Sequence, residues 1–212
     1  MLRAVGLTKR YGGITALAPV DLTLSEGECL GLAGANGSGK STLMSLLAQT
    51  QRPDGGDILA DGNSVLGSRA FVRRQVGYVP QRDALLEDLR VSQQLRLWQG
   101  LCGIRGRPDE EILSLLGLEN LMDRRIAGLS GGMKKRVSIA MALLGRPRYL
   151  LMDEAFAGLD EEYRGALTGW LLSYVARGGA LLWCSHESDE LRVLCGRVVV
   201  LEQGRVTQGG LI

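Results

Sequence analysis

Short apolar runs alternate with amphipathic stretches along this chain of 212 residues. The alternation is typical of an α/β protein, in which helices cover a mostly parallel sheet. The apolar runs predict strands near residues 2–7, 20–24, 28–33, 57–60, 76–79, 149–153, 180–184 and 197–201. A last strand at 204–207 follows the turn in the sequence LEQGRV, whose glycine suits a hairpin.

The amphipathic stretches predict helices over 40–49, 130–145, 161–176 and 187–194. Residues 84–128 are also mainly helical in pattern, and they interrupt the main alternation between a strand and a helix. We therefore expect a single domain over residues 1–212. An inserted helical subdomain, which includes the helix at 130–145, covers about 84–145 of it.

The composition fits a soluble globular protein, with 45% hydrophobic and 23% charged residues. The net charge of +2 is too small for a nucleic-acid-binding surface, so no direct contact with nucleic acid is expected. Four cysteines without CxxC spacing and a single histidine make no plausible zinc set, and Cys29 and Cys184 fall in apolar runs typical of a core. The sequence has no stretch of about 18 apolar residues and no signal peptide at its start, so we expect a cytoplasmic protein.

A glycine-rich loop follows the strand predicted at 28–33 and leads into the helix predicted at 40–49. It has the pattern G-x-x-x-x-G-K-S, which starts at Gly34 and ends with Gly39, Lys40 and Ser41. Gly34, Gly37 and Gly39 let the backbone turn its N–H groups around phosphate oxygens. The helix start adds further donors, Lys40 adds a positive charge and the Ser41 hydroxyl is a magnesium ligand. The alternative is a glycine-rich turn without a ligand.

Further polar residues follow other predicted strands. Asp153 and Glu154 end the strand at 149–153; Asp153 is a candidate magnesium ligand and Glu154 a candidate acceptor of a proton from an attacking water. Gln81 follows the strand at 76–79 and is a candidate contact to magnesium and to that water. Tyr11 is a candidate for stacking on an adenine ring. Without the phosphate loop, each of these would be an ordinary strand exit, surface or packing residue.

His186 is the only histidine of the chain and follows the apolar strand at 180–184. A lone histidine is more often a residue without a specific role. In an open α/β sheet, however, ligands bind at the carboxyl ends of the strands, where the phosphate loop, Gln81 and Asp153 also lie. We therefore expect His186 to contact the terminal phosphate of a nucleotide.

A second candidate anion site lies at the start of the helix predicted at 130–145. Ser130 is a good N-cap, and Gly131 and Gly132 leave the first turn bare. The alternative is a plain capped helix whose basic residues 134–136 form a solvated face. A second site is useful if it closes on the nucleotide bound by another copy of the chain.

These motifs together resemble the ATP-binding subunit of an ABC transporter over nearly the whole chain. Walker A is GANGSGKST, the Q-loop glutamine is Gln81, the signature is LSGGM, Walker B is YLLMDE, the D-loop is AGLD and the H-loop residue is His186. The resemblance implies a P-loop NTPase core with a mostly parallel sheet, an antiparallel β subdomain and an inserted α-helical subdomain. It also implies ATP and Mg²⁺ as cofactors.

The resemblance assigns roles to individual residues. Catalytic roles fall to Glu154, His186 and Gln81, and magnesium contacts to Ser41, Gln81 and Asp153. Nucleotide contacts fall to Tyr11, Gly34, Asn36, Gly37, Ser38, Gly39, Lys40, Ser41, Thr42, Ser130, Gly131 and Gly132.

The implied partners are a second ATPase copy, arranged head to tail as a homodimer or with a paired homologue, and separate transmembrane permease subunits. The chain would then be peripheral on the cytoplasmic face of the membrane. Met133 stands where the family usually has glutamine and Ala155 where it usually has proline, and LSGGMKKR resembles the ABC-2-type exporters. The chain is also expected to lack the appended regulatory domain of several importer ATPases. The alternative is a non-transport ABC ATPase that acts as a mechanical switch in cell division or nucleic-acid maintenance.

A docking segment for the membrane partner is expected at about 82–104, directly after the Q-loop. Its apolar residues Leu85, Leu86, Leu89 and Trp98 look exposed in the sequence pattern.

Overall fold

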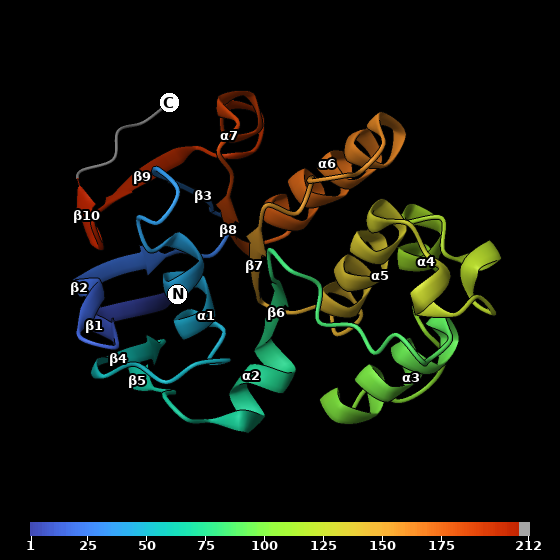
Figure 1. Cartoon of the computed structure of the whole chain (residues 1–212), viewed down its shortest axis with the longest axis horizontal. Helices are drawn as coiled ribbons and strands as arrows, with labels where there is room; N and C mark the ends of the chain where they lie inside the picture. The colour runs from blue at the N-terminus through green and yellow to red at the C-terminus, as the bar shows by residue number, and fades with distance from the viewer. Residues whose placement is uncertain (208–212) are drawn as a thin grey trace.

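Two sheets and a group of helices build the part of the chain that the computed structural model describes, residues 1–207 (Figure 1). The strands are β1 (Leu2–Tyr11), β2 (Ile14–Leu24), β3 (Cys29–Ala33), β4 (Gly55–Ala60), β5 (Asn63–Ser64), β6 (Val76–Val79), β7 (Tyr149–Asp153), β8 (Ala180–Cys184), β9 (Arg197–Glu202) and β10 (Arg205–Thr207). The α-helices are α1 (Lys40–Leu47), α2 (Arg69–Gln75), α3 (Val91–Cys102), α4 (Glu110–Leu115), α5 (Gly131–Leu143), α6 (Glu161–Ala176) and α7 (Ser188–Leu194). Short 3₁₀ turns, η1 (Glu119–Leu121) and η2 (Ile126–Gly128), precede α5.

The larger sheet has the strand order β10-β9-β3-β8-β7-β6, and only the β10–β9 pair of the six is antiparallel. Its central strands are buried on both faces, which explains why they read as continuous apolar runs in the sequence. Alternate residues serve two separate cores: Leu150 and Met152 belong to the core under α5 and α6, whereas Leu151 belongs to the core around α1. The predicted α/β class with a mostly parallel sheet is confirmed.

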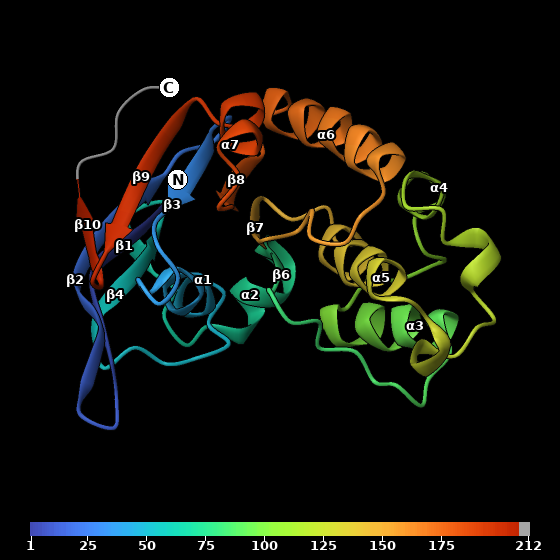
Figure 2. The same ribbon diagram turned by 45° about the horizontal axis from the view of Figure 1, so that its top comes forward.

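The smaller sheet is antiparallel, with the order β2-β1-β4-β5, and confirms the β subdomain that the family resemblance implies. Its first two strands are longer than predicted, because the hairpin of β1 and β2 continues to Tyr11 and resumes at Ile14 (Figure 2). On β1 the extension is polar and partly exposed, on β2 it mixes exposed residues with the buried Leu17 and Ala18, and the register shifts at several points. It therefore lacks the clean alternation that marks a half-buried strand in a sequence.

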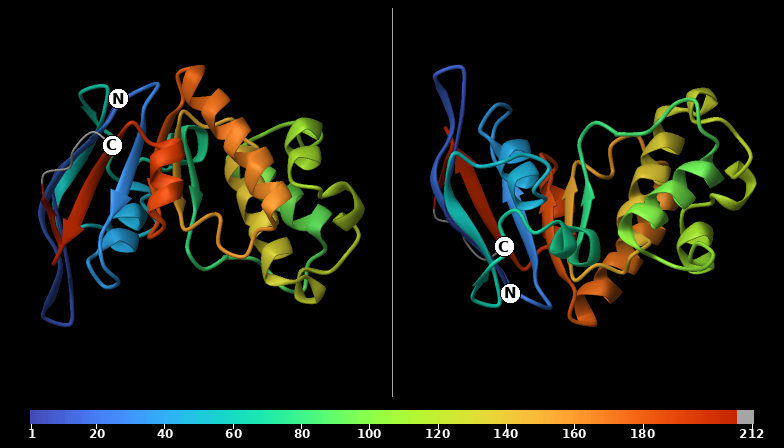
Figure 3. Two further views of the ribbon diagram at one scale, coloured as in Figure 1. Left: turned by 90° about the horizontal axis from the view of Figure 1, so that it is seen from above. Right: turned by 90° about the horizontal axis from the view of Figure 1, so that it is seen from below.

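The helices α3, α4 and α5 gather at the end of the molecule away from the antiparallel sheet, as Figure 3 shows. They share one core with β6 and β7 through residues such as Leu95, Ile112 and Val137. Helix α2 is absent from the sequence prediction, because its seven residues RAFVRRQ include no fully buried residue and are too short to show a clear helical period. Its N-cap is Ser68, whose hydroxyl accepts from the N–H of Phe71 at 3.3 Å. The four helices predicted at 40–49, 130–145, 161–176 and 187–194 are confirmed with small differences at their ends.

Within residues 1–207, no helix is both long enough and apolar enough to cross a membrane. The longest, α6, has 16 residues, which at about 1.5 Å per residue falls short of a bilayer core of about 30 Å.

Candidate functional site

The glycine-rich loop joins β3 to α1 with a backbone that other residues could not adopt. Gly34 has φ 145° and Gly39 has φ 107°. A Cβ on Gly34 would overlap the carbonyl oxygen of Leu201, and one on Gly39 would lie 2.7 Å from the carbonyl oxygen of Ala16. The loop is therefore shaped both by its own backbone angles and by neighbouring chain packed against it.

Lys40 begins α1 and folds back over this loop. Its side chain is largely buried, and its Nζ donates to the carbonyl oxygens of Gly34 at 2.7 Å and Ala35 at 3.0 Å. Gly39, the N-cap, offers no side-chain acceptor to the first N–H groups of α1. The loop thus presents a positive charge and a helix start whose donors carry no side-chain cap, which is the arrangement that binds phosphate.

Four strand ends bring the remaining candidates to this loop, because β3, β8, β7 and β6 are consecutive neighbours in the sheet. Asp153 ends β7 and is 1% exposed. Its Oδ2 has no hydrogen-bond partner among the described residues. A buried carboxylate oxygen without a partner is unusual and suits a cation ligand.

Burial raises the pKa of the Tyr78 phenol and of the Cys184 thiol, and the charge of Asp153 raises both further. Both groups are already mainly protonated near neutral pH, and the raised pKa values keep them so at higher pH. The immediate surroundings of Asp153 therefore add no competing negative charge from these two side chains.

Glu154 lies at the centre of a contact between three polar side chains. Gln81 Nε2 donates to Glu154 Oε2 at 3.0 Å, and His186 Nδ1 lies 3.3 Å from Glu154 Oε1. The backbone of Glu154 has φ 49°, an uncommon value for a non-glycine residue, and its N–H donates to the carbonyl oxygen of Cys184 at 2.9 Å. The carboxylate, held by Gln81 and His186, lines the same cavity as the glycine-rich loop.

A cavity of about 550 Å³ lies between these groups and the glycine-rich loop. It is lined by Tyr11, Ala16, Asn36, Gly37, Gly39, Lys40, Ser41, Thr42, Gln81, Glu154 and His186. Tyr11 reaches it from the end of β1, 44% exposed, with its hydroxyl hydrogen-bonded to Gln51. Three other candidates do not line this cavity. Gly34 and Ser38 belong to the loop itself, and Asp153 is the last residue of β7.

Three of the nucleotide-contact candidates lie elsewhere in the chain. Ser130 caps α5, accepting from the N–H of Met133 at 3.3 Å, and is exposed together with Gly131. Gly132 packs against the carbonyl of Gly158, in the segment after Glu154, so closely that a Cβ would overlap it. The structure therefore separates the start of α5 from the cavity within one chain.

The basic residues after the α5 start are not a solvated face, which corrects that alternative. Lys135 and Arg136 are both buried, and only Lys134 is partly exposed, paired with Glu87 at 2.7 Å. Arg136 donates to the carbonyl oxygen of Leu116 at 2.9 Å. Its guanidinium lies 4.1 Å from the centre of the Tyr163 ring. The pattern of three consecutive cations gave no sign of this burial, because lysine and arginine are rarely buried unless they are paired.

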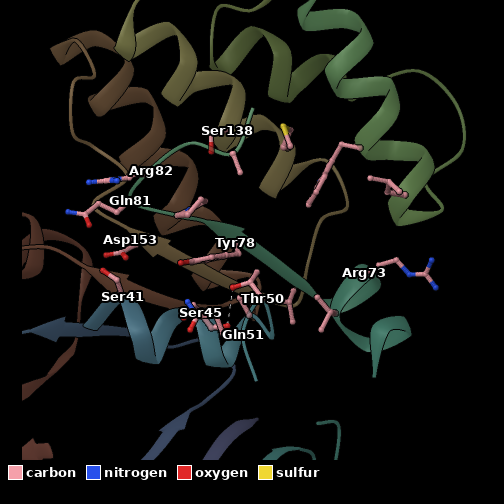
Figure 4. A pocket seen from close by; sticks show the side chains of 18 of the residues that line it. Ser41, Ser45, Thr50, Gln51, Arg73, Tyr78, Gln81, Arg82, Ser138 and Asp153 are labelled. Carbon is pink, nitrogen blue, oxygen red and sulfur yellow. Dashed lines mark hydrogen bonds between the residues drawn. The ribbon is translucent and has the colours of Figure 1, made fainter. Parts of the chain in front are cut away.

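A second cavity, of about 640 Å³, separates the strand-end region from the helical end of the molecule (Figure 4). Its walls are mostly apolar and include Val72 of α2, Tyr78 of β6, Trp98 and Leu101 of α3, and Met141 of α5. Ser41, Gln81 and Asp153 also line it, and the two cavities meet at Ser41 and Gln81, which line both. We refer to this second cavity as the interlobe groove.

Of the apolar residues expected to be exposed near the groove, Leu86 is 53% exposed. Leu85, Leu89 and Trp98 are only partly exposed, and Leu85 and Trp98 pack against the helical core.

A family model described as "ABC transporter" matches residues 17–157. The chain is 37% identical over 210 residues to "Nod factor export ATP-binding protein I" of Mesorhizobium japonicum, covering 97% of this chain and 62% of that protein. It is 34% identical over 214 residues to the protein of that name in Ralstonia nicotianae, covering 99% and 67%. It spans less than two thirds of the first of these relatives.

Solved structures give the same result for the fold. The structure titled as the ATP-binding subunit of an ABC transporter superposes with a TM-score of 0.90 at 29% identity, covering all of this chain and 90% of the other. A dimeric bacterial ABC transporter cassette superposes with a TM-score of 0.88 at 25% identity, covering all of this chain and 98% of the other.

Proposed function

The chain belongs to the ABC transporter family, and from this premise we propose that it binds and hydrolyses ATP to power export through separate membrane subunits. The observation that carries the proposal is the contact of Gln81, Glu154 and His186 at the mouth of a phosphate-binding loop. Such a cluster can position a water beside a terminal phosphate, which is the chemistry of an ATPase.

ATP binding rests on the loop and on Tyr11. The backbone from Gly34 to Gly39, Lys40 and the start of α1, including Ser41 and Thr42, are proposed to hold the phosphates. Tyr11 is proposed to stack on the adenine, because it lines the same cavity and remains 44% exposed without a base against it.

Magnesium would be held by Ser41, Asp153 and Gln81. The unpartnered Oδ2 of Asp153 supports this assignment, since a buried carboxylate oxygen without a hydrogen bond fits a hard cation. The ion supplies neutralisation of the negative charge on the β- and γ-phosphates.

Glu154 is proposed to act as general base. Its carboxylate takes a proton from a water, whose oxygen attacks the γ-phosphorus while the bond to the bridging oxygen of ADP breaks, giving ADP and inorganic phosphate. Gln81, which follows β6, contacts one carboxylate oxygen of Glu154, and His186, which follows β8, contacts the other. These two contacts hold the orientation of the Glu154 side chain. His186 is 59% exposed on its side chain, so it is free to contact the γ-phosphate.

A second copy of the chain, or a paired homologue, is proposed to complete each site. Ser130 and Gly131 are exposed and do not line the cavity of their own chain, and a helix start of this kind can bind an anion. In a head-to-tail pair, Ser130, Gly131 and Gly132 of one copy would cover the γ-phosphate bound by the other. The dimeric cassette among the solved structures supports such a pair.

The interlobe groove is proposed as the docking site of the membrane subunit, with residues 82–104 on its helical side (Figure 4). The charged groups on its rim are Arg73 and Arg82, and the one carboxylate in its lining, Asp153, is buried. An apolar segment of the partner that carries acidic residues fits this rim. The chain would then be peripheral on the cytoplasmic face of the membrane.

We further propose that residues 1–212 are one ABC ATPase domain with a helical subdomain at about 84–145. Residues 208–212 of this domain lie outside the described residues. The names of the relatives favour export over the alternative of a mechanical switch in cell division or nucleic-acid maintenance.

The proposed function can be tested by purifying the tagged chain from detergent-solubilised membranes. We expect a multi-span membrane protein to co-purify and the complex to release phosphate from MgATP. A chain that hydrolyses ATP but enriches no membrane protein would support the mechanical switch instead. A chain that neither binds nor hydrolyses ATP would contradict both.

A further inference from the structure

Lys135 is a buried lysine in the second turn of α5, with 6% of its side chain exposed. Its Nζ donates to the carbonyl oxygens of Pro80 and Gln81, each at 3.1 Å, and lies 3.1 Å from Oδ1 of Asp83. All of these partners belong to the loop that follows β6. One buried ammonium group thus contacts this loop at three residues within four positions, Pro80, Gln81 and Asp83.

The loop depends on that ammonium for its position. Among the backbone hydrogen bonds outside helices and strands within residues 1–207, none includes residues 80–85. The next anchors follow later, where the N–H of Leu86 donates to Gln94 Oε1 at 3.0 Å and the N–H of Ala127 donates to the carbonyl oxygen of Glu87. The contacts with Lys135 therefore set where the backbone of Gln81 lies relative to α5.

The same helix carries the exposed start proposed to face the second copy. Lys135 follows Gly131 by four residues, so the two residues lie on one side of α5, about one turn apart. At the other end of the contact, Gln81 Nε2 bonds to Glu154. A continuous series of contacts thus runs from Glu154 through Gln81 and Lys135 to the start of α5.

We propose that Lys135 is a positioning residue that couples the placement of Gln81 at the nucleotide to the placement of the α5 start. The proposal rests on the proposed ATPase function and deepens it. If the loop moved without the helix, the ammonium would lose its acceptors while still buried, which is strongly unfavourable. Loop and helix therefore move as one body when nucleotide engages Gln81.

The test compares three variants of the full chain: Lys135→Met, which removes the charge at similar length; Lys135→Arg, which retains it; and Lys134→Met, an adjacent control on the same helix. ATP affinity is measured by calorimetry, kcat and KM by phosphate release, and folding by thermal unfolding. For Lys135→Met we expect kcat about tenfold to a hundredfold lower, as for other displaced catalytic groups. Its ATP affinity should stay within about twofold of the parent, because Lys135 does not line the nucleotide cavity.

Lys135→Arg should recover part of kcat, and Lys134→Met should remain within about twofold of the parent, since its ion pair with Glu87 is exposed. The proposal is overturned if Lys135→Met turns over like the parent, if Lys134→Met loses as much kcat, or if the loss in Lys135→Met is a loss of ATP affinity.

If Lys135→Met does not fold, Asp83→Asn tests the same contact from the loop side. We expect a smaller loss of kcat with unchanged ATP affinity, and no loss would overturn the proposal. These outcomes are distinct from a failure of the proposed function, which would appear as absent ATP hydrolysis in the parent chain.

Discussion

The two anion-binding regions of the chain differ in how complete they are. The loop at Gly34–Lys40 faces Gln81, Glu154 and His186 across one cavity, and its lysine is already bonded to two carbonyls. The start of α5 has an exposed serine and glycine and faces none of these groups in its own chain. Under the proposed function, the first region would bind nucleotide within one chain, whereas the second would act only when another molecule meets it.

This difference explains where sequence change is tolerated. A side chain added at Gly131 would meet nothing within 4 Å, whereas one at Gly132 would overlap the carbonyl of Gly158. No steric contact within its own chain therefore requires glycine at 131, whereas close approach of a phosphate in the proposed pair would. Gly132 is required for the close approach of α5 to the segment after Glu154.

The largest effect is expected from Glu154→Gln, which changes the first region at its centre. The amide cannot accept a proton from water, so turnover should fall about 10²- to 10⁴-fold while ATP remains bound. Phosphate release and calorimetry measure the two quantities, and sedimentation should reveal an ATP-bound dimer. As a control, Glu87→Gln, at an exposed carboxylate that lines neither cavity, should turn over normally. Near-normal turnover in Glu154→Gln would remove this residue as the base.

Lys40→Ala should weaken ATP binding about tenfold to a hundredfold, because a charged hydrogen bond to phosphate contributes about 1.5–3 kcal/mol. Calorimetry on the isolated chain tests this without a partner. The thermal stability of the variant should be measured as well, because the carbonyl oxygens of Gly34 and Ala35 lose their hydrogen-bond donor in Lys40→Ala. Unchanged affinity would show that the phosphates bind elsewhere.

A mixture of two variants tests whether the second region acts between copies. A dimer of Lys40→Ala has no lysine in either site, and a dimer of Gly131→Asp places a carboxylate against phosphate in both. The mixed dimer has one intact site of two. About half of the dimers in an equal mixture are mixed, so the mixture should recover up to about a quarter of the parent activity. ATP-dependent dimers in the Glu154→Gln background give a second readout. If Gly131→Asp instead abolishes ATP binding to the monomer, the two regions meet within one chain.

The first region was largely predictable from the sequence, and the second only in part. Lys40, Asp153, Glu154 and His186 all follow apolar strands, and parallel strands bring their ends together by topology alone. The separation of Ser130 from the cavity, by contrast, depends on how α5 packs, which no local pattern encodes. For the same reason the burial of Lys135 could not be predicted. Three consecutive cations on a helix indicate a solvent-exposed face unless their carbonyl partners, which lie far away in the sequence, are known.

The smallest effect on ATP hydrolysis is expected in the apolar part of the interlobe groove, away from Ser41 and Gln81, where the groove meets the first cavity. Leu101, which lines the groove, and Leu86, two residues beyond Ala84 of its lining, are more than half exposed, at 54% and 53%. Leu86→Glu and Leu101→Glu add a charge without removing buried packing, so the fold and ATP affinity should be unchanged and basal turnover should stay within about twofold. Capture of the membrane partner and ATP-dependent transport should be lost, because an apolar contact would have to bury a carboxylate. Leu172→Glu, an exposed leucine on α6 outside the groove lining, is the matched control and should leave capture intact. If both groove variants capture the partner and support transport like the parent, the docking surface lies elsewhere, and the groove has no part in coupling the two regions to the membrane.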